Sequence, residues 1–160
     1  MENNFNNDLP YTLEEYNDFI GQEKAGYYTE KFKLANRGNK ASWNWPAFFF
    51  SAIWLMYRKM YAIGAGIFVC NLVLVSIHRV LGLVLNIVVA IFANYLYSQH
   101  VNTKIAQIKA LGLSKAEEKM KLVNQGGVNI VIPIVFAVIY VLIIVLLVLV
   151  FATLFTFATK

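Results

Sequence analysis

Apolar and charged residues are segregated along the chain into long alternating blocks. Between residues 42 and 97 the only formal charges are Arg58, Lys59 and Arg79, and residues 122–159 carry none. Soluble domains contain about a quarter charged residues, whereas uncharged apolar runs of this length are typical of segments that lie in lipid. The pattern therefore predicts an all-α integral membrane protein.

The blocks divide the chain into five regions. We expect a cytoplasmic tail with short helices (1–42), an interfacial or re-entrant aromatic helix (43–59), an antiparallel transmembrane hairpin (60–97), a basic cytoplasmic helical loop (98–127) and one long C-terminal transmembrane helix (128–160).

The tail combines a helix-start signal with aromatic residues at helical spacing. Thr12 and Glu15 match a capping box, which predicts a short helix over Leu13–Ile20. A second helix is expected over Glu23–Ala35, where Tyr28 and other aromatic residues recur on one face. These aromatics either pack within a small helical hairpin or dock on a membrane surface or a partner.

The aromatic segment is too short to cross a bilayer. Pro46–Tyr57 spans only about 18 Å as a helix, against about 30 Å of hydrocarbon. We therefore expect an interfacial or shallow re-entrant helix, with a fourth crossing as the less favoured alternative. Its expected interface anchors are Trp43, Trp45, Trp54, Tyr57, Arg58, Lys59 and Tyr61.

Three other segments are long enough to cross. Met60–Ile77 and Val80–Tyr97 each measure about 27 Å as helices, and Ile130–Ala158 is long enough for one tilted span. Basic residues favour the cytoplasmic side, so the tail and the lysine-rich loop are both expected there, with Lys160 outside. In that loop Ser114 and Glu117 predict another capped helix.

Polar and small residues inside the predicted hairpin suggest how its helices pack. Asn71 and Asn86 are equidistant from the turn at His78-Arg79, so they are expected at the same depth and in contact. Asn94 is a further expected interhelical polar contact. The residues expected to permit close packing are Ala62, Gly66 and Cys70 on the first helix, with Gly82 and Ala90 on the second.

The residue types needed for catalysis do not converge in this sequence. The predicted membrane region between residues 42 and 97 contains no Asp or Glu, and the single cysteine, Cys70, lies in an apolar run. His78 and His100 fall in loops expected on opposite faces of the membrane. The interpretation is a non-enzymatic protein with no cofactor and no metal site.

The run Asn44-Trp45-Pro46-Ala47-Phe48-Phe49-Phe50, followed by Trp54 and by Tyr57-Arg58-Lys59-Met60-Tyr61, resembles a bacterial inner-membrane family catalogued as domain of unknown function 2628. Supporting stretches extend from Phe19 to about Gly127. Ser51-Ala52 stands where members often have Gly-Pro. The resemblance implies an integral membrane protein and supplies no activity.

These observations give two functional hypotheses. The favoured one is an accessory or assembly subunit of a bacterial envelope complex. The alternative is a small oligomeric channel or transporter with a path lined by Asn71, Asn86 and Asn94. Expected partners are the lipid bilayer, another membrane protein or a second copy of the chain, and no nucleic acid. Anionic lipid is the expected ligand of Lys104, Lys109 and Lys115.

Overall fold

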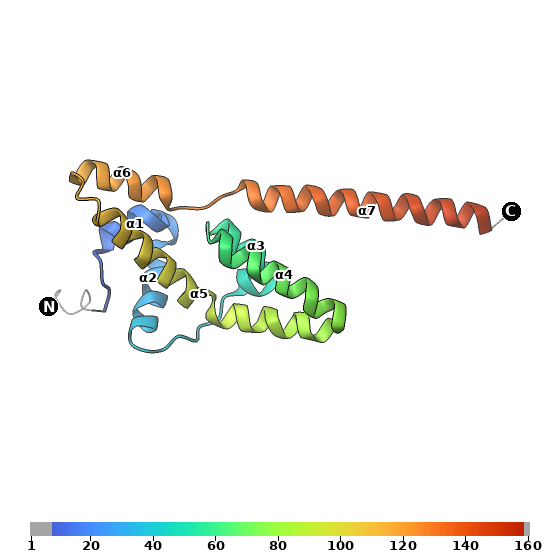
Figure 1. Cartoon of the computed structure of the whole chain (residues 1–160), viewed down its shortest axis with the longest axis horizontal. Coiled ribbons are helices and arrows are strands. Elements are labelled where there is room, and N and C mark those ends of the chain that lie inside the picture. The colour runs from blue at the N-terminus through green and yellow to red at the C-terminus, as the bar shows by residue number, and fades with distance from the viewer. Residues whose placement is uncertain (1–7, 159–160) are drawn as a thin grey trace. The chain divides into compact units, whose positions relative to one another are not determined.

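The computed structural model describes residues 8–158, apart from the side chains of residues 140, 147, 152, 153 and 155–158. Over that range the chain forms seven α-helices and no strand (Figure 1). It divides into two compact units, Met1–Asn129 and Ile130–Lys160, which we describe separately. The expectation of an all-α protein is confirmed.

The helices begin and end close to the positions expected from the sequence. In the first unit they are α1 (Leu13–Ile20), α2 (Gln22–Asn36), α3 (Trp45–Tyr57), α4 (Tyr61–Ile77), α5 (Arg79–Lys109) and α6 (Lys115–Gln125). Both predicted capping boxes are present, at Thr12 before α1 and at Ser114 before α6. In each, the hydroxyl accepts from the third helical N–H, and the glutamate at that position accepts from the capping residue's N–H.

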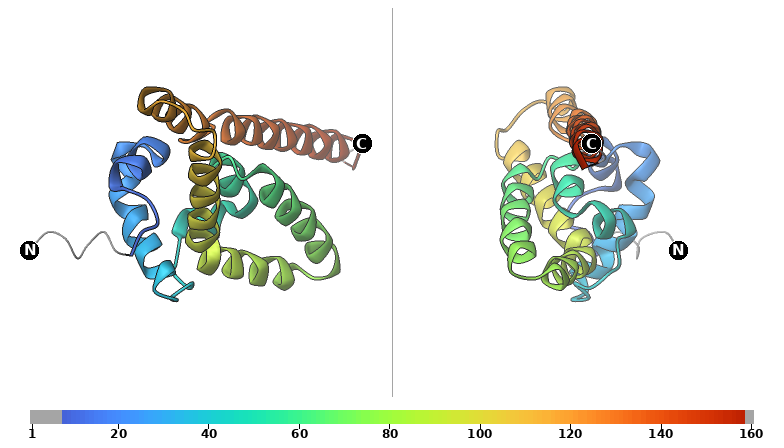
Figure 2. Two further views of the ribbon diagram at one scale, coloured as in Figure 1. Left: turned by 60° about the vertical axis from the view of Figure 1, so that its left-hand side comes forward. Right: turned by 90° about the vertical axis from the view of Figure 1, so that its right-hand side faces the viewer.

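One helix, α5, connects the apolar and the polar parts of this unit. Its first part packs against α3 and α4, and its second part packs against α1, α2 and α6 (Figure 2). The helix is continuous through residue 97, and α1 and α2 of the tail and α6 of the 98–127 region all pack on its second part.

The aromatic residues of the tail pack on α5, which answers a question that the sequence left open. Tyr28 and Phe32 of α2 contact the ring of Tyr97, with ring centroids 5.0 and 5.7 Å apart. Tyr16 of α1 is fully buried, and its hydroxyl donates to Asn102 of α5 at 2.5 Å. Burial of these large rings is the main force that holds α1 and α2 on α5.

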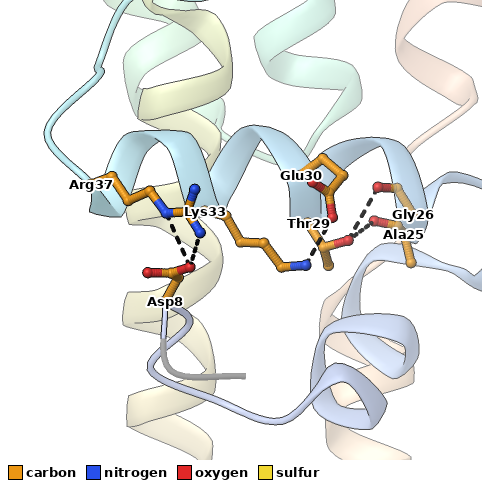
Figure 3. A network of polar contacts seen from close by, with 7 residues as sticks. All are labelled: Asp8, Ala25, Gly26, Thr29, Glu30, Lys33 and Arg37. Carbon is orange, nitrogen blue, oxygen red and sulfur yellow. Dashed lines mark hydrogen bonds and ion pairs between the residues drawn. The ribbon is translucent and has the colours of Figure 1, made fainter. Parts of the chain in front are cut away.

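Polar contacts lie along α2 and at its C-terminal end. The Arg37 Nε–H donates to Asp8 at 3.0 Å, and Thr29 Oγ1 donates to the carbonyl of Ala25 at 2.9 Å (Figure 3). Lys33 forms an ion pair with Glu30 one turn earlier at 2.8 Å. The two ion pairs are exposed and contribute little to stability compared with the buried rings, whereas Thr29 is buried.

The chain around α3 doubles back along α5. Before α3, the Ser42 N–H donates to the Ile91 carbonyl at 2.9 Å and the Asn44 N–H donates to the Ala90 carbonyl at 3.0 Å. At the other end of α3, Trp54 contacts Tyr97 with ring centroids 6.1 Å apart. The chain therefore runs along α5 as far as Ala90, and α3 then leads back along α5 so that its end lies beside Tyr97.

A kink interrupts α3 at Ser51. Its backbone has φ 34° and ψ −106°, a conformation that is costly for residues with a Cβ atom, and its buried hydroxyl makes no hydrogen bond with the described residues. Glycine adopts positive φ without that cost. The kink therefore occurs although neither residue 51 nor residue 52 is a glycine or a proline.

We expect Ser51→Gly to raise the free energy of unfolding by about 1 kcal/mol, because it removes backbone strain and no hydrogen bond. Chemical unfolding in detergent measures the change. Ser51→Ala is the control, since it removes the same hydroxyl and keeps the strain. Equal stability of the two variants would contradict a strained Ser51.

The second unit is α7 (Val131–Ala158), a continuous apolar helix. Where its side chains are described, most large apolar ones are exposed, for example Leu142 and Phe151. By length and composition, α5 and the Val131–Phe151 part of α7 are sufficient to cross a membrane, while α3 and α4 are shorter apolar helices.

Candidate functional site

A buried arginine lies where α2, α3 and α5 meet. Arg58, directly after α3, is only 5% exposed. Its guanidinium carbon lies 4.5 Å from the ring centre of Tyr28, 5.1 Å from that of Tyr97 and 5.5 Å from that of Tyr57. These distances place the cation within the range of ring-face attraction, so three tyrosines surround it.

The charge of Arg58 has no carboxylate partner among the described residues. Its Nη2 donates to the Tyr28 hydroxyl at 2.8 Å, while Nε and Nη1 make no hydrogen bond there. Burial raises the pKa of Tyr28, and the neighbouring guanidinium opposes that rise without cancelling it. Tyr28 therefore stays protonated at neutral pH, and its oxygen accepts from the arginine while its ring faces it.

Two of the expected interface anchors are instead part of this core. Trp54 and Arg58 are both 5% exposed. Their burial corrects the sequence interpretation, and the reason is that Tyr97, far along the chain, occupies the face on which they lie. Trp43, Trp45 and Tyr61 are exposed at 36%, 62% and 46%, and their role as interface anchors stays a prediction.

Two further expected anchors, Tyr57 and Lys59, are half-buried, and both make hydrogen bonds to the segment that ends α6 and follows it. Lys59 Nζ donates to the carbonyls of Asn124 and Gly126, and the Tyr57 carbonyl accepts from the Asn129 N–H at 2.8 Å. A lysine that binds the last carbonyls of a helix also favours its dipole. Sequence reasoning missed this contact because the partners are more than sixty residues apart.

The predicted contact in the middle of the hairpin is present. Asn71 Nδ2 donates to Asn86 Oδ1 at 3.2 Å, and both side chains are half-buried. Gly82 is buried beside them, and a Cβ atom there would lie 2.4 Å from Cγ2 of Val75. The glycine therefore permits the close approach of α4 and α5 that the sequence suggested.

Asn94 does not join this pair. Its Oδ1 accepts from Asn44 at 2.8 Å, and its Nδ2 donates to the Ser42 hydroxyl at 2.9 Å. Asn44 also caps α3, since its Oδ1 accepts from the Ala47 N–H at 3.0 Å. Asn94 thus fixes the start of α3 on α5, a role that depends on a chain segment fifty residues away.

The small residues expected to pack on α4 lie on its exposed face. Ala62, Gly66 and Cys70 are exposed, and nothing lies within 4 Å of a Cβ atom built on Gly66. Gly64 is the residue in close contact, since its Cβ atom would lie 2.6 Å from Cγ of Met56. The four-residue spacing does place small residues on one face of α4, but α3 packs on the opposite face of this helix. Ala90 is buried as expected.

A charged cleft of about 500 Å³ lies between α1, α6 and the end of α5. Lys109 is ion-paired with Glu15 in this cleft. Lys119 pairs with Glu14 at 3.3 Å. Burial tends to raise the pKa of Glu15, but hydrogen bonds from Lys109 and Thr12 outweigh it and the pKa is lowered. Lys104 and Lys115 form no ion pair among the described residues.

His100 makes the stability of the polar part sensitive to pH. Its ring packs on Phe19 with centroids 6.4 Å apart, and burial, aided by the Lys104 charge, lowers its pKa. The unfolded chain therefore binds the proton first as the pH falls below about 6.5. We expect the free energy of unfolding to decrease from pH 7.5 to 5.5, and less so in His100→Gln. An identical slope in the variant would contradict this assignment.

No group of three or more His, Cys, Asp or Glu side chains is placed to hold a metal ion in the part of the chain that the structure describes. The polar and charged contacts that characterise this part of the chain are the Arg58–tyrosine cluster, the Asn71–Asn86 pair and the hydrogen bonds of Asn94 and Lys59.

Comparison with protein families gives a match over residues 16–102, to the family described as "Protein of unknown function (DUF2628)". The match covers more than half of the chain. The chain belongs to this family. The DUF2628 match includes Tyr28, Arg58 and Tyr97, and it ends before α6 and α7. It also includes the three asparagines of the expected polar contacts, Asn71, Asn86 and Asn94. Comparison with curated proteins and with solved structures found no match.

Proposed function

We propose that this DUF2628 protein is a non-enzymatic, multi-pass protein of the bacterial plasma membrane that acts as an accessory or assembly subunit of an envelope complex. The observation that carries the proposal is the exposure of large apolar side chains on the α4–α5 hairpin and on α7. Ile77 is 68% exposed, Leu72 57% and Leu146 61%. Contiguous apolar surface of this kind needs lipid or a partner to cover it.

The course of α3 supports three crossings rather than four. Because the chain descends along α5 to Ala90 and α3 returns toward Tyr97, α3 would enter and leave the bilayer on one side. The tail and the lysine-rich α6 region then share the cytoplasmic side, in agreement with the positive-inside rule. Lys104 and Lys115 remain candidates for contact with anionic headgroups there.

Thiol accessibility tests this topology. In a Cys70→Ser background, cysteines at Asn39 and Gln107 should resist membrane-impermeant reagents in intact cells and react after lysis. A cysteine at Lys160, beyond the described residues, should react without lysis. Labelling at Gln107 from outside would refute the three-span topology.

The exposed aromatic group at the start of α3 is the surface we propose for a membrane partner. Trp45, Phe49 and Phe50 are at least 60% exposed, while Asn44 at the start of the same helix is bonded to Asn94 and to the Ala47 N–H. Purification in mild detergent followed by mass spectrometry should recover a defined partner, and Trp45→Ala with Phe49→Ala should release it. Arg37→Ala, on the exposed outer side of α2, is the matched control.

The channel alternative has less support. It requires Asn71, Asn86 and Asn94 to face one path, whereas Asn94 is bonded to Ser42 and Asn44. Solute flux in proteoliposomes that disappears in Asn71→Leu would favour the channel over the accessory role.

A further inference from the structure

The amide pair in the hairpin has hydrogen-bonding capacity left over. A primary amide has two donors and an oxygen with two lone pairs, and the 3.2 Å bond uses only one N–H of Asn71 and one lone pair of Asn86. Among the described residues, Oδ1 of Asn71 and Nδ2 of Asn86 make no hydrogen bond. Both side chains are half-buried, so an unsatisfied acceptor and donor lie side by side at the surface.

The surface around this pair is apolar. Leu72, Val75, Leu83 and Ile87 are all exposed, at 57%, 44%, 50% and 37%. From Tyr61 to Gln99, Arg79 at the far turn is the only charged residue. In hydrocarbon, where water is scarce, the free amide atoms need a partner from protein.

We propose that two copies of this chain pair through Asn71 and Asn86 to form a two-fold symmetric dimer, an inference that rests on the proposed insertion of the hairpin into the membrane. Oδ1 of Asn71 in one copy accepts from Nδ2 of Asn86 in the other, and the reciprocal bond forms by symmetry. Each copy thus supplies one donor and one acceptor to the other copy.

The geometry of the hairpin makes a second copy the fitting occupant. Asn71 and Asn86 are bonded across antiparallel helices, so they lie at one depth. A two-fold axis along the membrane normal preserves depth, and it therefore brings Asn71 of one copy opposite Asn86 of the other. Symmetric interfaces of this kind require a self-complementary patch, which the amide pair provides.

Counting copies in liposomes tests the pairing. The chain, labelled at a cysteine placed at Asn39 in the Cys70→Ser background, should bleach in two steps at high protein-to-lipid ratio and in one step on dilution. Asn71→Leu and Asn86→Leu each remove both bonds between copies, which predicts about sevenfold weaker association. Ser76→Ala is the matched control on α4, because its hydroxyl already donates to the Val73 carbonyl at 2.7 Å, and it should associate like the unaltered chain.

The other outcomes distinguish a failure of the pairing from a failure of the proposed topology. Single-step bleaching of the unaltered chain at all ratios refutes the dimer even if the asparagine variants fail to fold, and leaves the three-span topology intact. Association that is unchanged in both variants assigns the contact to another surface. External labelling at Gln107 would refute the three-span topology without changing the depth of Asn71 and Asn86 in the hairpin, so the bleaching counts distinguish a failed pairing from a failed topology. Flux through single copies would show that water, and not a second copy, satisfies the amides.

Discussion

Arg58→Ala is expected to lower the free energy of unfolding by about 3 kcal/mol. The change removes attraction to three ring faces and the hydrogen bond to Tyr28, and it leaves a cavity where α2, α3 and α5 meet. Loss of an unpaired buried charge opposes these effects. We expect the packing and ring contacts to prevail, because the guanidinium touches rings on all three elements. Denaturant unfolding in detergent, followed by Trp54 fluorescence, measures the difference.

Arg58→Lys and Arg58→Met separate charge from volume at this position, and Arg37→Ala is a control at an exposed site. Arg58→Lys keeps the charge and loses the flat guanidinium, so it should cost about half as much. Arg37→Ala, an exposed arginine paired with Asp8, should change stability far less. Wild-type stability of Arg58→Met would contradict a stabilising role for the cation and leave only its volume.

Gly126→Ala is expected to destabilise the polar part by about 3 kcal/mol or more, or to separate α6 from α1. A Cβ atom at this position would lie 2.0 Å from the Phe19 carbonyl oxygen and 2.8 Å from that of Leu122. Both are backbone atoms, which cannot rotate away as the end of a flexible side chain can. The adjacent Gly127 N–H donates to the same Phe19 oxygen at 2.6 Å, so a shift also breaks a hydrogen bond.

Gly26→Ala is the matched control for this variant. Gly26 lies inside α2, and nothing lies within 4 Å of a Cβ atom built there. Alanine favours helix over glycine by up to about 1 kcal/mol, so this variant should gain stability. Equal effects of the two substitutions on unfolding would contradict the close approach of α6 to α1.

The sequence by itself determined the local structure. Capping boxes at Thr12 and Ser114, the proline near the start of α3 and the turn at His78 mark chain positions directly, because each depends on neighbours within four residues. The Asn71–Asn86 contact could also be predicted, since two helices joined by a tight turn place equidistant residues at the same depth and a buried amide favours an amide partner. The family could be identified from the aromatic motif.

Only the tertiary structure decided which faces these helices bury. Arg58 and Trp54 are buried because Tyr97 comes back against them, and Ala62, Gly66 and Cys70 are exposed because α3 packs on the opposite side at Gly64. Helical periodicity gives the angle between residues on one helix, not the direction in which a neighbour lies. Asn94 illustrates the same limit, because its partners Ser42 and Asn44 lie about fifty residues earlier in the sequence and only the tertiary fold brings them together.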